Sequence, residues 1–240
     1  MYAFYWCDSL TELIIGNGVH TLEDFAIGNC PKLVNVSIPS SLKSIGSLFS
    51  SCDAIEGTVY NDVVYVGNAS NAYLCALYPL SSDVESVTLH RDTLFMNSYA
   101  FENCKKLTSI TLNQGLLHIG YGAFGGCSSL KEINVPSTVS SLDAHVFENC
   151  TSLVEITIPD GIGFLASSLF SNCTQLKTVN IPNSITYIAT NVFTDCSSLE
   201  VIVFRGTSAE WKNISKYSPW DSGTPEYTVK CTDVDVNKAS

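Results

Sequence analysis

Cysteine offers the most reactive side chains in this sequence, because its ten thiols could form disulfides or hold a metal ion. Eight of the ten recur at one position of a repeated interval that is mostly 23 residues long: Cys7, Cys30, Cys52, Cys104, Cys127, Cys150, Cys173 and Cys196. Stacked repeats would place neighbouring thiols about 5 Å apart with parallel Cβ vectors, which does not favour a disulfide. The Cys-x-x-Cys spacing typical of zinc sites is absent. We expect these eight thiols to be free and buried, and we leave a pairing between Cys75 and Cys231 open.

Histidine and glutamate are the other residues that could support catalysis or metal binding. The four histidines fall at different repeat positions without a carboxylate pair, so we expect ordinary surface or rim positions for them: His20, His90, His118 and His145. Glu132 and Glu155 share one repeat position with Glu12, and such a pair could bind calcium or act as acid and base. Since no pocket motif surrounds them, we expect a solvated acidic strand face. Nucleophile-elbow, P-loop and dinucleotide-binding motifs are absent, so we predict no catalytic residue, no cofactor, no metal ligand and no enzymatic activity.

Composition narrows the class of partner. The formal net charge is −11 and the 12 basic residues form no run, which argues against nucleic acid and anionic membrane surfaces. Charged residues make up only 15%, so Ser, Thr and Asn supply much of the polar surface, as is common in secreted proteins. No apolar run approaches the length of a membrane span, so we expect no membrane insertion. The first residues lack a signal-peptide pattern and match the closing part of a repeat, so we expect a signal sequence upstream or removed.

An internal repeat of 23 residues must position these side chains. The copy that begins at Cys150 has eight further core positions, at Leu153, Ile156, Ile158, Pro159, Ile162, Leu165, Leu169 and Phe170. The copies that begin at Cys127 and Cys173 match all eight, and the copy at Cys104 differs in having Asn113 in place of proline. A unit this small cannot bury its own apolar face. We therefore predict that the units stack into a solenoid with one continuous core.

Local pattern predicts the elements within each unit. In the copy at Cys150, Ile156 and Ile158 alternate with Glu155 and Thr157, which is the period of a half-buried strand, and the strand ends at the following proline. We expect a second short extended segment over 161–165 and a 3₁₀ or short helical turn around 169–173. The predicted fold is a β-rich repeat solenoid.

A segment between Cys52 and Cys104 departs from the repeat by 29 residues beyond one period. Two aromatic-rich runs around a Gly-Asn turn predict an inserted β-hairpin at about 56–80. Its tyrosines are candidate aromatic anchors for a partner, at Tyr60, Tyr65 and Tyr73. Packing of the hairpin onto the rod explains the same residues and is the favoured explanation.

The C-terminal segment 205–240 also departs from the repeat, which leaves 1–204 as the predicted solenoid. The segment is rich in aromatic residues, including Trp220 and Tyr217, and an open last coil of a solenoid needs a cover. Val201 and Val203 are apolar on an otherwise polar strand face. We therefore predict a capping module that packs against these valines.

The pattern C-x-x-L-x-x-I-x-I-P, closed by A/V-F-x-x-C, resembles the BspA-like leucine-rich repeats, also called the Treponema pallidum type. The resemblance covers roughly residues 3–204. It implies a leucine-rich repeat solenoid in a surface or secreted protein, with adhesion to host proteins or neighbouring cells as the usual proposal. The chain departs from the pattern at Ser81, where cysteine is expected, and at Ile27, where phenylalanine is expected.

The outward strand positions are where partner recognition would be encoded. The candidate residues are Ser109, Thr111, Glu132, Asn134, Glu155, Thr157, Thr178 and Asn180. We predict a non-enzymatic, extracellular or cell-surface recognition module that binds a protein or glycan ligand on host or neighbouring cells. The alternative is a structural spacer that presents another domain of a larger surface protein. We expect a monomer, with end-to-end stacking through the first coil as an option.

Overall fold

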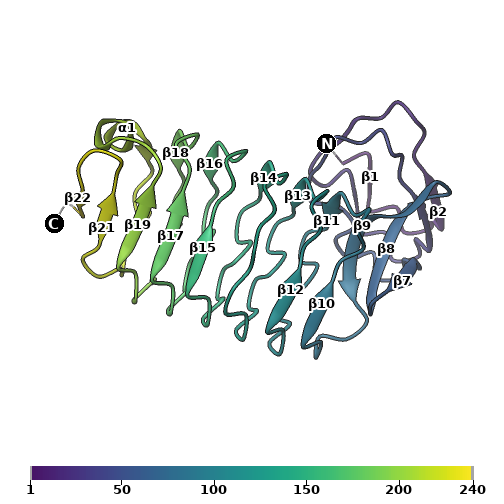
Figure 1. Cartoon of the computed structure of the whole chain (residues 1–240). Coiled ribbons are helices and arrows are strands. Elements are labelled where there is room, and N and C mark those ends of the chain that lie inside the picture. The colour runs from purple at the N-terminus through teal and green to yellow at the C-terminus, as the bar shows by residue number, and fades with distance from the viewer. Residues whose placement is uncertain (1, 239–240) are drawn as a thin grey trace.

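The computed structural model describes residues 2–238 and shows an elongated stack of coils (Figure 1). Met1 and residues 239–240, at the ends of the predicted domain ranges, lie outside the described residues. Most coils contribute one short parallel strand to a face that we call the strand column. These strands are β2 (Glu12–Ile14), β5 (Asn35–Ser37), β10 (Ser86–Thr88), β12 (Ser109–Thr111), β15 (Glu155–Thr157), β17 (Thr178–Ile181) and β19 (Val201–Phe204). In β15 only the central Ile156 is buried, as the alternation predicts.

A second column of two-residue strands follows after a bend in each coil. It consists of β3 (Thr21–Leu22), β6 (Ser44–Ile45), β11 (Phe95–Met96), β13 (His118–Ile119), β14 (Ser141–Leu142), β16 (Phe164–Leu165), β18 (Tyr187–Ile188) and β20 (Ser215–Lys216). Partners are usually 23 positions apart, as for Phe164 and Tyr187. The extended segment predicted at 161–165 is therefore present but shorter. In the first two coils, β1 (Phe4–Tyr5) pairs with β4 (Ile27–Gly28) in the turn region.

The turn that closes each coil forms a third column, and its hydrogen bonds continue through every coil from residue 99 to residue 222. At one such step the N–H groups of His145, Phe147 and Asn149 donate to the carbonyls of Ser167, Leu169 and Ser171. In these coils the residue before the repeated cysteine has a left-handed φ of 57–74°, at Asn103, Gly126, Asn149, Asn172 and Asp195. Asn, Asp and Gly tolerate this conformation best. Because a positive φ interrupts a right-handed helix, these segments are hydrogen-bonded turns and not the predicted 3₁₀ or helical segments.

Two ladders of side chains fill the core beneath the turn column. Five buried rings stack with centroid separations of 5.6–5.7 Å, from Phe101 through Phe124, Phe147 and Phe170 to Phe193. The Cys173 thiol donates to the carbonyl of Phe147 at 3.0 Å, and the thiols of the neighbouring coils repeat this bond. The repeated cysteines are free and, apart from half-buried Cys7, they are buried as predicted. Burial raises the pKa of Cys150 to about 12, so this thiol is a neutral donor.

The inserted segment contains three strands, β7 (Thr58–Tyr60), β8 (Val63–Asn68) and β9 (Asn71–Pro79). β8 and β9 form the predicted hairpin, and β7 adds an antiparallel pair through a turn at Asn61 and Asp62. The hairpin is part of the main sheet. β8 pairs with β5 of the strand column, whereas β9 pairs with β11 of the second column (Figure 1).

This change of column divides the core into two clusters, so the prediction of one continuous core is wrong. Alternate residues of a strand point to opposite faces, and β8 separates the clusters in this way. Val64 and Val66 belong to the N-terminal cluster, and Val63 and Tyr65 belong to the C-terminal cluster. The N-terminal coils consequently pack beside the second column of the later coils.

The C-terminal segment continues the stack by one coil. Its helix α1 (Ser208–Asn213) starts with a capping box formed by Thr207 and Glu210. β20 extends the second column, and β21 (Thr228–Lys230) extends the strand column and pairs antiparallel with β22 (Val236–Asn237). Val201 and Val203 lie opposite residues of β21 and remain half-buried. The segment thus covers the edge of the last coil and not the outer face that these valines indicated.

Candidate functional site

A depression of about 490 Å³ lies on the strand column between β12 and β15, and we call it the open groove. Six of the eight predicted face residues line it, namely Ser109, Thr111, Glu132, Asn134, Glu155 and Thr157, together with Ile110, Ile133 and Ile156. The six polar residues are exposed. The remaining two candidates, Thr178 and Asn180, are half-buried in β17 beside the groove.

The groove exists because the strand column is interrupted. Residues 131–136 form no strand, and Figure 1 shows no arrow between β12 and β15 at this level. In a regular coil the N–H of Ile158 donates to the carbonyl of Asn180 at 2.9 Å. Within the described residues, the equivalent N–H groups of Leu112 and Val135 have no backbone acceptor in the neighbouring coil. Two successive backbone hydrogen bonds between coils are therefore missing from the strand column, and we call these positions open rungs.

The turn column stays intact across the opening, whereas the second column is interrupted at one of the two steps. In the turn column the N–H of Phe124 still donates to the carbonyl of Val146 at 2.9 Å. In the second column His118 remains paired with Ser141, but β14 and β16 belong to different sheets, so this column is interrupted at the following step. Because the turn column keeps the coils in contact, their separation on the strand side is a bend of the stack. The bend exposes some of the core: Ile133 is 7% exposed, against 1% for Ile156 at the same repeat position.

The two sides of the groove differ in how firmly their side chains are held. On the β15 side, the Asn180 amide donates to Glu155 Oε1 at 3.0 Å and to the Thr157 hydroxyl at 3.2 Å. On the other side, the described residues provide no side-chain hydrogen-bond partner for Glu132 or Asn134. The groove thus combines one fixed carboxylate with one that can adapt to a ligand.

A second hollow of about 310 Å³ continues the groove past the strand ends and shares Asn134 and Thr157 with it. Arg205 lies in this hollow, 2.7 Å from Asp160 and 3.0 Å from the carbonyl of Ile158, to which it donates. Its charge is therefore neutralised locally. The sequence pattern did not reveal this clamp between coils, because Arg205 follows the last repeat.

The predicted aromatic anchors do not form an exposed group. Tyr65 is fully buried and belongs to the core, so the prediction that it anchors a partner is wrong. Tyr73 is half-buried and stacks on His90 with centroids 3.7 Å apart, and Tyr60 packs edge-on against the same imidazole. Only Tyr60 offers a substantial surface, at 37% exposure. These contacts agree with the alternative that the rings fix the insertion to the rod.

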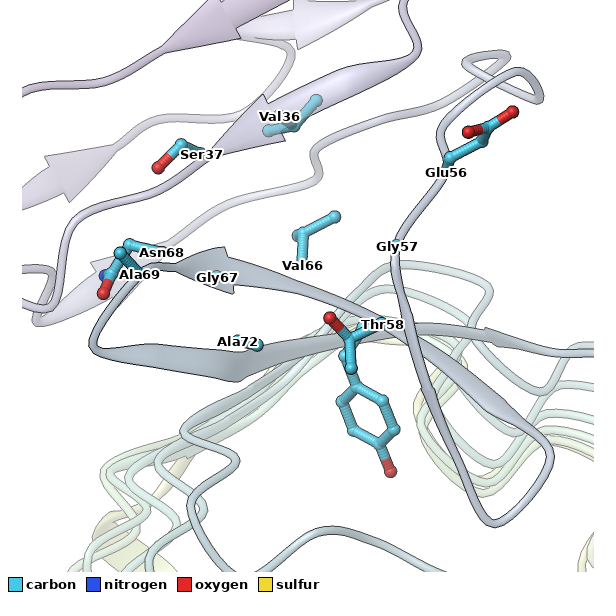
Figure 2. A pocket seen from close by; sticks show the side chains of 11 residues that line it. Val36, Ser37, Glu56, Gly57, Thr58, Val66, Gly67, Asn68, Ala69 and Ala72 are labelled. Atoms are coloured by element: carbon cyan, nitrogen blue, oxygen red, sulfur yellow. The ribbon is translucent and has the colours of Figure 1, made fainter.

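A further hollow of about 310 Å³ lies between β5 and the insertion, and its lining residues were not predicted (Figure 2). Glu56 is the only ionisable carboxylate in its lining, and Figure 2 shows its side chain at the rim. Gly57 is required for the close approach of the strands, because a Cβ there would lie 2.2 Å from the Tyr65 carbonyl oxygen. The hollow is a consequence of this close packing of the strands.

Two further histidines, His118 and His145, also have structural roles. His118 is 5% exposed, so its predicted surface or rim position is wrong: the N-terminal coils cover it, and its Nε2 lies 3.3 Å from Asp143 Oδ2. His145 contacts Glu148 at 2.8 Å. Residues 2–238 contain no group of three or more His, Cys, Asp or Glu side chains suited to a metal ion.

Cys75 and Cys231 lie in different parts of the stack. Cys75 is buried in β9, and Cys231 follows β21 near the opposite end (Figure 1). Because of this separation, Cys75 and Cys231 cannot form an intramolecular disulfide. No helix among the described residues has the length and hydropathy of a bilayer span.

Comparisons with known proteins agree with this architecture. A sequence profile described as the BspA type leucine rich repeat region matches residues 1–77 and 94–218 in six copies. No curated protein matches the chain. Among solved structures, a leucine rich cell surface protein from Faecalibacterium prausnitzii is 26% identical with a TM-score of 0.63, over 89% of this chain and 65% of that one.

Two further structures extend the likeness. A leucine-rich repeat protein from Bacteroides ovatus is 25% identical with a TM-score of 0.55, over 96% of this chain and 58% of that one. The leucine rich repeat protein of T. pallidum is 21% identical with a TM-score of 0.56, over 73% of this chain and 86% of that one, and it shares the fold. The chain spans less than two thirds of the first two proteins.

Proposed function

Because this chain belongs to the BspA-type leucine-rich repeat family, we propose that it is a non-enzymatic recognition module that acts at a cell surface or outside the cell. The family is typical of surface and protein-interaction modules, and the Faecalibacterium prausnitzii protein is described as a cell surface protein. The more specific proposal is adhesion, in which the strand column binds a ligand on host or neighbouring cells.

The observation that carries this proposal is the open groove. It gathers polar side chains from three consecutive coils into one depression, and four of the six have no side-chain hydrogen-bond partner among the described residues. Ligand sites in proteins are concave and place a few polar groups precisely. A rigid stack of coils holds such groups at fixed spacing, so a partner would lose little free energy in ordering them.

The test is binding of the purified chain to epithelial cells, mucin and matrix proteins in a surface assay. The double variant Thr111→Ala/Asn134→Ala removes two groups of the groove without touching the core. The control Asn35→Ala changes an exposed residue of β5, on the regular part of the strand column. Adhesion through the groove predicts that the double variant binds at least about tenfold more weakly, whereas the control binds normally. Equal binding of all three proteins would contradict it.

The spacer remains the second candidate because of the turn column. Its backbone bonds continue through every coil from residue 99 to residue 222, and a continuous ladder of this kind favours a stiff rod. A spacer predicts that the isolated chain binds none of the tested surfaces, and that shortening the rod by one coil in its parent protein reduces the reach of a second domain.

A further inference from the structure

We propose that the open groove binds an extended, positively charged segment of a protein partner, with a lysine or arginine side chain between Glu132 and Glu155. This inference rests on the proposed function and specifies the chemistry of its ligand. It follows from the charge of the groove, from the open backbone rungs and from the side chains that are missing from its lining.

The groove presents two carboxylates, and none of its nine lining residues is basic. Nearby cations are directed elsewhere. Lys177 pairs with Glu200 at 3.3 Å, Arg205 pairs with Asp160, and Lys131 does not line the groove. The chain as a whole carries a net charge of −11, which adds a long-range attraction for cationic partners. A cationic side chain would therefore gain charge-assisted hydrogen bonds to Glu132 and Glu155, which form no ion pair with the described residues.

The open rungs add a preference for an extended main chain. The carbonyl of Asn134 lacks the N–H donor from Leu112 that a regular rung would provide, and the carbonyl of Thr157 lacks the donor from Val135. Backbone groups without a protein partner are readily satisfied by the main chain of a bound peptide, as in recognition by strand addition. A guanidinium group has five donors in a planar fork and suits a site made of carboxylate, amide and carbonyl oxygens.

Other occupants fit less well. The lining contains no aromatic ring on which a sugar could stack. Nucleic acid and anionic lipid carry the same sign of charge as the groove. Meanwhile the Asn180 amide already holds the Glu155 carboxylate, so this half of the site is formed before binding.

The experiment is calorimetric titration of the full chain with a short synthetic peptide that repeats Gly-Ser-Arg. The matched peptide contains citrulline, which has nearly the same shape as arginine but no charge. The groove variant is Glu132→Gln/Glu155→Gln, in which glutamine still offers Asn180 an acceptor. The control variant Glu12→Gln/Glu85→Gln makes the same change in net charge at exposed residues outside the groove.

We expect the groove variant to bind the arginine peptide about tenfold more weakly than the native chain, and the control variant to bind within about twofold. The citrulline peptide should bind weakly to all three proteins. Equal weakening in both variants would overturn the inference, because it would show attraction to net charge alone. That failure would leave the proposed function intact if Thr111→Ala/Asn134→Ala still lost binding to cells.

Discussion

The phenylalanine ladder makes a quantitative prediction about what holds the coils together. Phe147 is fully buried and stacks between Phe124 at 5.7 Å and Phe170 at 5.6 Å, with interplanar angles of 5° and 4°. Substitution of a buried phenylalanine by alanine costs about 3–5 kcal/mol of unfolding free energy. The loss of two aromatic contacts, each worth about 0.5–1.5 kcal/mol, places Phe147→Ala toward the upper end of that range.

Phe164 supplies a matched control on the outer face of the next coil. It also stacks in parallel, with Tyr187 at 4.8 Å and 4°, but it has one ring partner and is 39% exposed. We expect Phe164→Ala to cost about 1 kcal/mol, since one aromatic contact and a partly exposed side chain are lost.

Urea unfolding followed by circular dichroism measures both variants. Against a total stability of roughly 5–15 kcal/mol, Phe147→Ala should shift the midpoint strongly or split the transition, because a repeat array is held together by contacts between neighbouring coils. The reasoning is refuted if Phe147→Ala costs no more than Phe164→Ala. That result would mean that the hydrogen bonds of the turn column, and not the rings, provide the coupling.

Three further predictions concern the backbone and the thiols. Amide hydrogen exchange measured by NMR should be at least about tenfold faster at Leu112 and Val135 than at Ile158, because only Ile158 of these three donates to the neighbouring coil. Similar exchange rates would contradict the open groove. Because φ is 60° at Asn172, Asn172→Ala should lower the free energy of unfolding by about 1–2 kcal/mol, whereas Asn172→Gly should leave it nearly unchanged. Thermal unfolding tests this, and the control Asn35→Ala should stay within about 0.5 kcal/mol of the native chain. Burial raises the pKa of Cys150 and Cys196 from 9.0 to about 12, so above pH 9 the unfolded chain loses protons that the folded chain keeps. The free energy of unfolding should therefore fall by about 1 kcal/mol per thiol by pH 10. Thermal unfolding that shows no loss of stability between pH 8 and pH 10 would argue against neutral core thiols.

The sequence was sufficient to predict the repeating architecture. Apolar residues at fixed offsets from Cys150 predict which side chains enter the core, and Glu155 and Thr157 are exposed beside buried Ile156 as the alternation requires. These features are local: each depends on the strand period and on a neighbour that is another copy of the same unit. The position of the candidate face could be predicted for the same reason.

Features that depend on long-range packing could not be predicted in this way. Tyr65 and His118 carry polar groups and looked exposed, but both are buried where the N-terminal coils, the insertion and the later coils meet. The insertion itself is visible in the sequence. The insertion pairs with the strand column through β8 and β5, and with the second column through β9 and β11. No spacing within 56–80 encodes this change of column.

The open groove depends both on local sequence features and on long-range packing. Its residues 131–136 follow the same pattern as 154–159, so nothing in their types distinguishes an open coil from a closed one. The turn column keeps its hydrogen bonds throughout residues 99–222, and a bend in a stack held along one side must separate the coils on another. The sequence alone therefore determined which side chains face outward. Only the tertiary structure decided where the strand column opens, because curvature is a property of the whole stack.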